Sequence, residues 1–448
     1  MDYSDNFPAV AEIKGGKAIF LLGTDKYIGE GLDENGKPKE SETRVGVVPE
    51  QVEQMKDWLQ SNGVALDFFF VKGAGTRADF LDSSYLRTGG RLLFEHQLST
   101  MPAPHVVHAL KEPSGYETFI PGPFLRIGAL HSGAFDDKSG VAFLFEQRNF
   151  CAIFDGSNIG TADGKIPIRG AMSVFAGEIA AEFSVKHFAA RGVTNAKVII
   201  SGGGVVGKAS LNEFLKTGKE KCSEIIVVEP YQPTFEALKS TYGNEEKVKI
   251  VNGASLTAEQ VRNADAVILT AFIKGKSAPD VLMFDDIRQM SDNSIIVDVS
   301  IDERGGIKLP DFVKEDFALH DVVTKVSDAI TGLGKGITYI ADDHLPKHKP
   351  KKASIAHGGA ILPYISILLY CSAKLGGARQ VAKYILDGDF TDQEDPKAQE
   401  LLRHLRRGLA FYSPAPVKYN SSIINDIQNK TNLENFFRSV SIELDSFE

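Results

Sequence analysis

Cysteine is scarce in this chain: Cys151, Cys222 and Cys371 are the only three among 448 residues. They lie far apart and form no Cys-x-x-Cys spacing, which disfavours both a zinc site and a disulfide framework. The first ten residues, MDYSDNFPAV, are acidic and contain no apolar segment like that of a secretory signal. We therefore expect a cytoplasmic protein that binds no metal.

Positive charge is not in excess either, because 59 Asp and Glu outnumber 50 Lys and Arg and give a net charge of -9. A nucleic-acid surface is expected to carry clustered positive charge, so we predict no nucleic-acid partner. No apolar run reaches the about 18–20 residues that span a bilayer. The longest, residues 360–370, contains Pro363 and Ser366 and predicts a buried helix. We therefore expect no association with a membrane.

The chain is long enough for two domains, because a single core rarely serves so many residues. Short apolar runs followed by polar or helical segments are typical of α/β proteins. From residue 196 onwards this alternation becomes regular, which predicts a parallel, doubly wound sheet. The predicted strands are residues 18–23, 65–71, 105–111, 128–131, 151–154, 198–201, 224–229, 248–251, 266–270 and 295–299.

Helical spacing of apolar residues marks the segments on either side of this regular series. Residues 170–192 predict a helix of about 20 residues that could link two domains. Further helices are predicted at residues 354–375, 378–386 and 396–409. The chain after Ser413 is polar, and we expect it to be peripheral.

A glycine-rich turn, SGGGVVG, contains the pattern G-x-G-x-x-G as Gly202, Gly204 and Gly207. The first glycine permits a tight turn, the second lets backbone amides approach a pyrophosphate, and the third lets the helix pack on the strand. The turn follows an apolar strand and opens a helix, and Glu229 ends the next strand about 20 residues later. A carboxylate there would bind the ribose hydroxyls and repel a 2′-phosphate. The motif therefore predicts NAD, with a turn that binds nothing as the alternative.

We predict an α/β fold with two Rossmann-like domains, each with a parallel sheet, and a cleft between them. Residues 169–344 form the NAD-binding domain. This domain is inserted into a discontinuous substrate domain made of residues 1–168 and 345–448. A second glycine cluster, at residues 332–336, lacks the strand–turn–helix setting and is interpreted as a loop.

Four charged or titratable side chains lie at or near predicted strand ends: Arg44, Lys111, His131 and Asp302. Arginine is shaped to bind a carboxylate through two hydrogen bonds, and histidine can transfer protons near neutral pH. Three of them also have an ordinary interpretation. Arg44, beside a predicted short strand, could form a surface salt bridge, His131 could be structural, and Asp302 could be a turn residue.

The motifs around these residues resemble one family. Over roughly residues 40–370, the sequence resembles the superfamily of alanine dehydrogenases, the N-terminal part of transhydrogenases and lysine-forming saccharopine dehydrogenases. Seven segments match in the family's order: ETRVGVVP, LKEP, IGALHSG, DGKIPIRGAMSVFAGEIAA, SGGGVVG, ADAVILTAFIKGKSAPDVL and VDVSIDERGG. One match would mean little, but seven in register are specific.

The resemblance implies roles for the matching positions. Arg44 and Lys111 would hold the substrate carboxylate or keto oxygen, and Lys111 would also take part in catalysis. His131 would be the general acid/base, and Asp302 would position the amine or the attacking water. Such a set suits amine oxidation, which needs a carboxylate anchor and a base for the water that hydrolyses the imine. The NAD site would comprise Ser173, Gly202, Gly204, Val205, Val206, Gly207, Glu229, Val299, Ser300, Ile301 and Asp302.

Residues 340–354 depart from the alanine dehydrogenase pattern. They resemble the DHLP…P…AS segment of lysine-forming saccharopine dehydrogenases, whereas SGGGVVG and SVFAGEIAA are closer to alanine dehydrogenases. The departure brings a basic run that would attract a substrate with more than one carboxylate, with a solvated loop as the alternative. The run consists of Lys347, His348, Lys349, Lys351 and Lys352.

Taken together, the sequence predicts an NAD(H)-dependent oxidoreductase that acts on a CH–NH bond. The substrate would be an amino acid or a saccharopine- or opine-type secondary amine, interconverted with a 2-oxo acid plus an amine or ammonia. We expect a small-molecule amino acid or oxo acid as partner, and the resemblance favours a homo-oligomer. Two alternatives stay open: a non-catalytic NAD-binding or regulatory protein, and a soluble transhydrogenase-like hydride carrier.

Overall fold

The structure is a computed structural model that describes most of the chain. The described ranges are residues 7–24, 42–111, 115–130, 149–271, 278–300, 306–308, 324–325, 336–342, 345–413, 417–424, 427–439 and 443–447. Three predicted site residues, His131, Ile301 and Asp302, lie outside these ranges, as does most of the second glycine cluster.

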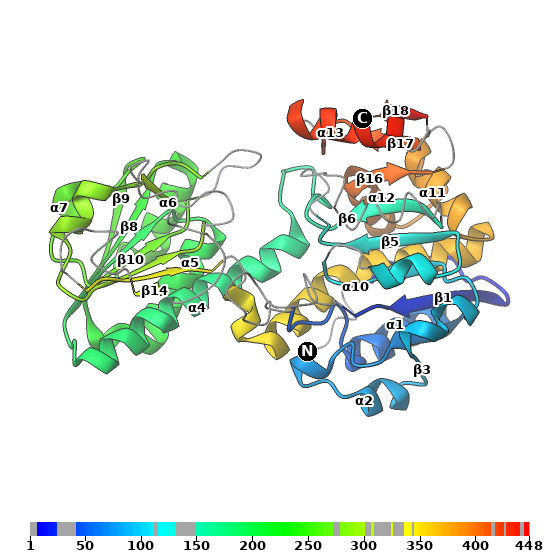
Figure 1. Cartoon of the computed structure of the whole chain (residues 1–448), viewed down its shortest axis with the longest axis horizontal. Helices are drawn as coiled ribbons and strands as arrows, with labels where there is room; N and C mark the ends of the chain where they lie inside the picture. The colour runs from blue at the N-terminus through cyan, green and yellow to red at the C-terminus, as the bar shows by residue number, and fades with distance from the viewer. Residues whose placement is uncertain are drawn as a thin grey trace. The chain divides into compact units, whose positions relative to one another are not determined.

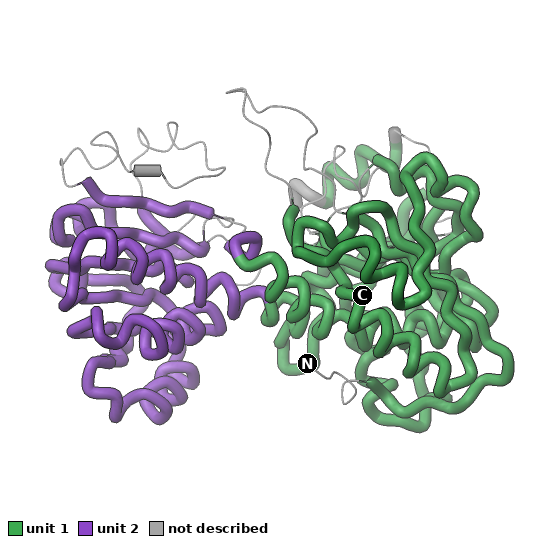
Figure 2. The backbone as a smooth tube through the Cα atoms, turned by 90° about the horizontal axis from the view of Figure 1, so that it is seen from below, with its two compact units in different colours: residues 1–171, 349–448 green, residues 172–348 purple. Residues whose placement is uncertain are grey.

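The chain divides into two compact units, shown in different colours in Figure 2. Unit 1 consists of residues 1–171 and 349–448, and unit 2 of residues 172–348. Unit 2 is therefore inserted into a discontinuous unit 1. The sequence predicted boundaries after residues 168 and 344, which lie a few residues before the boundaries between the two units.

Unit 1 is built on a nine-stranded sheet (Figure 1). Its elements are β1 (Gly16–Leu22), α1 (Pro49–Ser61), β2 (Val64–Val71), α2 (Asp82–Arg87), β3 (Arg91–Leu93), β4 (Val106–His108), β5 (Phe124–Gly128), β6 (Phe150–Asp155), α10 (Pro350–Leu375), α11 (Ala378–Asp387), α12 (Pro396–Gly408), β16 (Leu409–Tyr412), β17 (Val417–Asn420), α13 (Ile427–Ser439) and β18 (Leu444–Phe447). The strand order is β18-β17-β16-β6-β5-β4-β1-β2-β3. The strands from β6 to β3 are parallel, whereas β16 is antiparallel to both of its neighbours.

The C-terminal segment corrects the prediction of a peripheral tail. β16, β17 and β18 extend the sheet beyond β6, and Val417 and Tyr419 of β17 are buried. Leu433 and Phe437 of α13 pack into the same apolar cluster. The segment looks polar in sequence because only one face of each element is buried, so its apolar residues are interspersed with polar ones. In a strand of four residues this alternation is easily missed.

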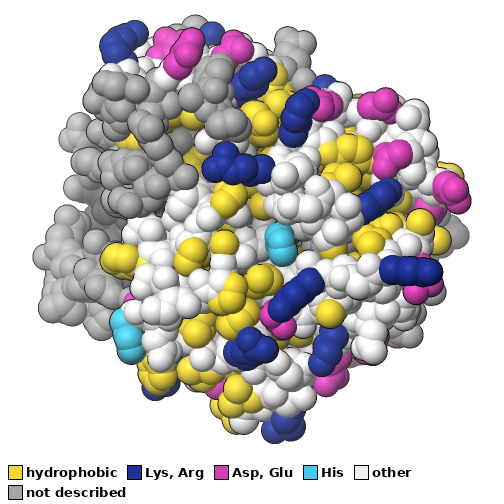
Figure 3. All heavy atoms as spheres, turned by 90° about the vertical axis from the view of Figure 1, so that its right-hand side faces the viewer, with side chains coloured by type: hydrophobic (Ala, Val, Ile, Leu, Met, Phe, Trp, Pro, Cys, Tyr) yellow, Lys and Arg dark blue, Asp and Glu magenta, His cyan; other side chains and the backbone are white. Residues whose placement is uncertain are grey.

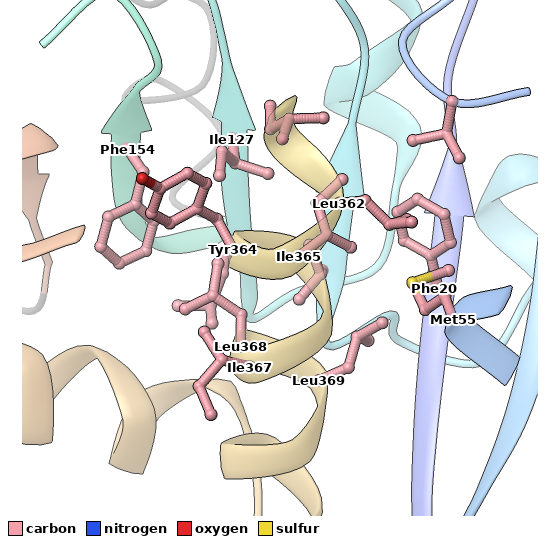
Figure 4. Packing of buried hydrophobic residues seen from close by; sticks show 14 of the residues in the cluster. Phe20, Met55, Ile127, Phe154, Leu362, Tyr364, Ile365, Ile367, Leu368 and Leu369 are labelled. Atoms are coloured by element: carbon pink, nitrogen blue, oxygen red, sulfur yellow. The ribbon is translucent and has the colours of Figure 1, made fainter. Parts of the chain in front are cut away.

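Helix α10 forms the centre of unit 1. Figure 4 shows its side chains pointing toward Phe20 of β1 on one side and toward Phe154 of β6 on the other. Among the described residues it is the one helix with the length and composition to cross a membrane, but 83% of its apolar window is buried. Its apolar character is therefore explained by the protein core.

Two segments of unit 1 differ from their predicted form. Residues 42–48, which include Arg44, are not a strand but an extended segment that leads into α1 at Pro49. The strand predicted at residues 128–131 lies earlier, as β5, which ends at Gly128. The sequence pattern misplaced β5 because Arg126 interrupts its apolar run.

Unit 2 carries a seven-stranded sheet. Its elements are α4 (Pro167–Arg191, which begins in unit 1), β7 (Ala196–Ser201), α5 (Val205–Glu213), β8 (Cys222–Glu229), α6 (Gln232–Tyr242), β9 (Val248–Asn252), α7 (Ala258–Val261), β10 (Ala266–Leu269), β12 (Ile295–Asp298), β14 (Thr324–Lys325) and β15 (Thr338–Ala341), with β11 (Leu282–Met283) and β13 (Ile307–Lys308) in a separate pair. The strand order is β14-β15-β12-β10-β7-β8-β9. Neighbouring strands are parallel, except that β14 is antiparallel to β15. From β7 the chain passes through β8 to β9 at one edge of the sheet. It then crosses to β10, on the other side of β7, and continues through β12 to β15. This reversal is the place where open α/β sheets bind ligands, at the carboxyl ends of the strands.

Candidate functional site

The glycine turn lies at this reversal, between β7 and α5. Gly202 has φ +95°, a conformation that side chains rarely adopt, so the tight turn requires glycine. A Cβ on Gly207 would collide with the carbonyl oxygen of Gly202, so helix and turn pack as closely as the motif predicts. No atom of the described chain lies within 4 Å of where a Cβ on Gly204 would stand. The turn thus leaves room for a phosphate beside the first amides of α5.

Glu229 lies at the end of β8, beside the turn. One carboxylate oxygen accepts the N–H of Gly203 at 2.6 Å, and the other accepts the N–H of Tyr231 at 2.7 Å. Each oxygen keeps further acceptor capacity, because an ionised carboxylate offers about four lone-pair positions. Glu229 therefore ties the glycine turn to the next loop and still presents a negative charge where a ribose would bind.

The structure adds two residues that the sequence analysis did not name. The hydroxyl of Thr270, just after β10, donates to the carbonyls of Ser201 at 2.7 Å and Gly202 at 3.0 Å and so fixes the turn from the neighbouring strand. Tyr231 follows Glu229, and 64% of it is exposed, which leaves an aromatic ring in solvent at the cofactor edge. Thr270 ends the strand predicted at residues 266–270, and Tyr231 is the second residue after the strand predicted at residues 224–229, so both could have been found by inspecting the carboxyl ends of the predicted strands.

The other predicted NAD-site residues that the structure describes are Ser173, Val205, Val206, Val299 and Ser300. Val205, at the start of α5, is exposed, whereas Val206 and Ser173 of α4 are half-buried. The N–H of Val299 donates to Leu269 at 2.9 Å, which holds the loop after β12 against β10. Ser300 donates from its N–H and its hydroxyl to the buried carboxylate of Asp298. The residues of unit 2 therefore fit a dinucleotide at the glycine turn.

In unit 1, Arg44 is buried and paired with Glu42. Nε and Nη2 of Arg44 donate to the two carboxylate oxygens of Glu42 at 2.7 and 2.6 Å, and the Arg44 N–H also donates to Glu42 at 2.9 Å. Burial alone would raise the pKa of Glu42, but the charge and hydrogen bonds of Arg44, with the charge of Lys111, lower it to about 2. Glu42 is therefore ionised and holds the guanidinium in one orientation. The surface salt bridge considered for Arg44 is wrong, because the pair is buried.

Lys111 lies three residues beyond the end of β4 and is half-buried. Its charge acts on Glu42, and it also acts on His357 of α10, where Arg44 acts as well. The structure therefore brings the two predicted substrate-binding residues, Arg44 and Lys111, into one electrostatic environment. The charged groups described there include the cations of Arg44 and Lys111 and the carboxylate of Glu42.

A pair of buried histidines borders this environment. The rings of His108 and His357 stack at 5.8 Å between centroids, with 8° between their planes. Nδ1 of His108 lies 2.8 Å from the carbonyl of Ile127, which assigns the proton to Nδ1. Nε2 of each ring has no hydrogen-bond partner among the described residues. Burial lowers both pKa values, that of His108 to about 4, so both rings are neutral near neutral pH.

Two hydrogen bonds join helix α10 to the Arg44 segment and to the start of α1. The hydroxyl of Ser354 accepts the N–H of Val45 at 2.9 Å, and Gln51 donates to the Ile355 carbonyl at 2.7 Å. A Cβ on Gly46 would collide with the ring of His108. The sequence analysis missed these contacts because all of them join distant residues, and the two hydrogen bonds span about three hundred positions.

The outer face of the chain shown in Figure 3 carries charges of both signs, scattered among small apolar patches.

Within the described ranges, no group of three or more His, Cys, Asp or Glu side chains is arranged to hold a metal ion.

Comparisons with known proteins agree with this architecture. Residues 171–388 match the family described as "Alanine dehydrogenase/PNT, C-terminal domain". The alanine dehydrogenase of Staphylococcus epidermidis is 28% identical over 357 residues, which covers 74% of this chain and 86% of that protein. The alanine dehydrogenase of Bacillus subtilis is 26% identical over 353 residues, covering 73% and 84%.

Solved structures show the same fold. An L-alanine dehydrogenase superposes with a TM-score of 0.65 at 18% identity and covers 93% of this chain and 99% of its own. A transhydrogenase from Sinorhizobium meliloti superposes with a TM-score of 0.59 at 17% identity and covers 79% and 96%.

Fold and site together define a dinucleotide-binding α/β protein with an inserted Rossmann unit. Residues 171–388 match the alanine dehydrogenase/PNT C-terminal domain family, and the chain is similar to alanine dehydrogenases over about three quarters of its length. The predicted superfamily, fold class and cofactor are confirmed, and the cofactor is NAD(H).

Proposed function

We propose that this chain oxidises the CH–NH bond of an amino acid, or of a saccharopine- or opine-type secondary amine, with NAD as the electron acceptor. The coarser class, an NAD(H)-dependent amino-acid dehydrogenase, is supported by the similarity to alanine dehydrogenases. The finer statement is supported by one observation in unit 1. Arg44 is buried beside Glu42, and the charges of Arg44 and Lys111 both act on Glu42 and on His357.

This charge balance suits a carboxylate ligand. Glu42 occupies one edge of the Arg44 guanidinium and fixes its orientation, so that less conformational entropy is lost when a substrate binds. The guanidinium of Arg44 and the ammonium of Lys111 are groups that bind carboxylates through charge-assisted hydrogen bonds. His108 and His357 are neutral and add no charge of their own.

The chemistry divides between the two units. NAD supplies the acceptor for the two electrons and the hydrogen lost from the substrate carbon. Arg44 and Lys111 would anchor the carboxylate and the developing oxygen. His131 would remove a proton from the amine and then from the water that hydrolyses the imine, and Asp302 would orient that water or amine. His131 and Asp302 lie outside the described residues, and their roles rest on the family resemblance.

The basic run bears on substrate size. Lys347 and His348 pair with Asp342, at 3.3 and 2.8 Å, so part of the positive charge is neutralised locally. Lys351 lies over the ring of Phe80 at 5.5 Å, and both Lys351 and Lys352 are exposed. We therefore propose that a substrate with a second carboxylate is favoured through Lys351 and Lys352, more weakly than five independent charges would predict.

A substrate panel tests this function. The purified chain is mixed with NAD and each of a set of amino acids and secondary amines, and in reverse with NADH and oxo acids, with or without ammonia or lysine. Reduced nicotinamide is followed by absorbance. We expect turnover with at least one member of the panel, and turnover with none would contradict the proposal.

Variants assign the roles in that assay. His131→Ala should lower kcat by about 10²–10⁴-fold with nearly unchanged NADH affinity. Lys111→Met should impair both kcat and KM. Lys56→Met, which removes a lysine that donates to the Thr88 carbonyl, is the matched control and should behave like the parent.

Location and assembly extend the same proposal. We propose a cytoplasmic enzyme that assembles as a homo-oligomer. Light scattering after size-exclusion chromatography measures the assembly, and a monomer at assay concentration would contradict it.

A further inference from the structure

Arg126 is a charged residue in the middle of a buried strand. It lies on β5, its side chain is fully buried, and it is the largest side chain among those with almost no exposure. A guanidinium has five N–H donors in a fixed plane, and burial makes each unsatisfied donor costly. Its hydrogen-bond partners therefore show what the residue does.

All five N–H groups of Arg126 have an acceptor. Nε and Nη2 donate to the two carboxylate oxygens of Glu117 at 2.8 and 3.1 Å, and Glu117 is also fully buried. The other three donors reach backbone carbonyls. Nη1 donates to Ala109 at 3.1 Å and to Ile127 at 2.6 Å, and Nη2 donates to Lys111 at 2.9 Å.

The three carbonyls belong to the segments that carry the proposed active-site residues. Ala109 and Lys111 lie in the loop that leaves β4, and Ile127 lies near the end of β5, the strand that leads toward His131. The carbonyl of Ile127 also accepts Nδ1–H of His108. A Cβ on Gly128 would collide with the Ala109 carbonyl, so the two strand ends are packed without spare room.

We infer that the buried Arg126–Glu117 ion pair is the positioning device for Lys111. This inference rests on the role of Lys111 in the proposed function. Glu117 pairs with the guanidinium, so Arg126 can bind the Lys111 backbone while its positive charge is balanced by an adjacent carboxylate. Lysine could not replace it, because an ammonium has three donors and no planar fork.

Stability alone does not account for this arrangement. Buried ion pairs are often no more stabilising than apolar residues of similar volume. If both partners became apolar, the carbonyls of Ala109 and Lys111 would lose the donors described here. The loop would then have to move to find water or other donors, and Lys111 would move with it.

The double variant Arg126→Met/Glu117→Leu separates a role in stabilising the fold from a role in positioning Lys111. We expect it to fold with a urea midpoint near that of the parent and to bind NADH with unchanged affinity, because the glycine turn lies in unit 2. Its kcat should fall at least about 10-fold, since small misplacements of a positioned group cost that much or more. Combined with Lys111→Met, it should cause no further loss.

A second measurement does not depend on turnover. An amine-reactive reagent is applied across a pH series, and modification of each lysine is measured by mass spectrometry. In the double variant, the rate and apparent pKa for Lys111 should change, while those for Lys56 should not. Tyr364→Phe is a matched control that removes a buried hydrogen bond, 3.0 Å to His404, away from this loop, and it should leave kcat and Lys111 labelling unchanged.

The outcomes are decisive. A folded double variant with parental kcat and parental Lys111 labelling overturns the inference. If the double variant does not fold, Arg126→Lys, which keeps the charge next to Glu117 but lacks the planar fork, takes its place, and the same two readouts decide. If the parent turns over no substrate, the proposed function fails, while Lys111 labelling still tests the positioning role of Arg126.

Discussion

The carboxylate of Glu229 accepts the backbone N–H of Gly203 at 2.6 Å. The residue expected to recognise the ribose of NAD therefore also holds the loop expected to bind the pyrophosphate. Its second oxygen accepts the N–H of Tyr231, so both sides of the carboxylate are fixed before a cofactor arrives. Substitution of Glu229 will thus disturb two parts of the cofactor site together.

Glu229→Gln should weaken NADH binding by about 10- to 100-fold, because an amide keeps only one acceptor oxygen and faces one of the two N–H groups with its NH₂. The variant should not gain affinity for NADPH, since the turn itself is loosened. Fluorescence titration with both nucleotides measures the change. Glu224→Gln, on the exposed side of β8 where Glu224 pairs with Lys249, is the control and should bind like the parent. Tighter binding of NADPH than NADH to the parent would refute the selection of NAD by Glu229.

Arg44→Lys should raise KM for the substrate carboxylate by about 10- to 100-fold, because lysine retains the charge but not the two-pronged geometry that Glu42 fixes. NADH affinity should not change. Initial rates at varied substrate concentration, with a parallel NADH titration, give both quantities. Arg91→Lys, at an exposed position beside Asp67, is the matched control. An unchanged KM in Arg44→Lys would show that the Glu42–Arg44 pair is only structural.

His108 should make the fold sensitive to acid. Its pKa is lowered from 6.5 to about 4 in the folded chain, first by burial and then by the charge of Arg126, so between these values the unfolded chain binds a proton that the folded chain does not. Stability therefore rises with pH through this range, and His108 contributes about 3 kcal/mol to the loss as pH falls from 6.5 to 4. Arg44, Lys111 and His357 face the same region, and the lowered pKa of His357 adds in the same direction.

The variant that tests this is His108→Asn, because the asparagine amide can still donate to the Ile127 carbonyl but does not titrate. Urea unfolding at several pH values measures the stability. The slope of the unfolding free energy against pH measures the number of protons taken up on unfolding. In His108→Asn this number should fall by about one in this range. His96→Asn, on the exposed turn after β3, is the control. An unchanged slope in His108→Asn would show that its ring is not kept neutral by the fold.

The double change Lys351→Gln/Lys352→Gln should raise KM for a substrate with two carboxylates by about 2- to 5-fold, and the effect should shrink with added salt. Alanine, with one carboxylate, should show a smaller change. Lys347→Gln should lower stability rather than affinity, because Lys347 is paired with Asp342. Steady-state kinetics at two ionic strengths measures the effect. Equal KM values for parent and double variant, with alanine as the best substrate, would mean that the basic run is a solvated loop.

Local patterns in the sequence determined much of unit 2. A strand, a glycine turn and a helix follow one another within about twenty residues, and Gly202, Gly207 and Glu229 can be assigned because each role depends on short-range geometry. The place of Lys111 after a strand could be predicted for the same reason. These residues are recognisable because their neighbours in sequence are their neighbours in space.

Only the tertiary structure decided how unit 1 supports those residues. His108 meets His357 because α10 crosses the sheet beside β4, and Arg126 meets the Lys111 carbonyl because β4 and β5 are adjacent. The C-terminal segment becomes β16, β17 and β18 because β6 offers an open edge to an antiparallel partner. Strand order and helix packing bring these groups together, and no periodicity within a short stretch of sequence encodes which distant segments will pair. The sequence by itself determined the cofactor turn and the candidate chemical groups, whereas the buried contacts that hold Arg44 and Lys111 in place depend on the complete fold.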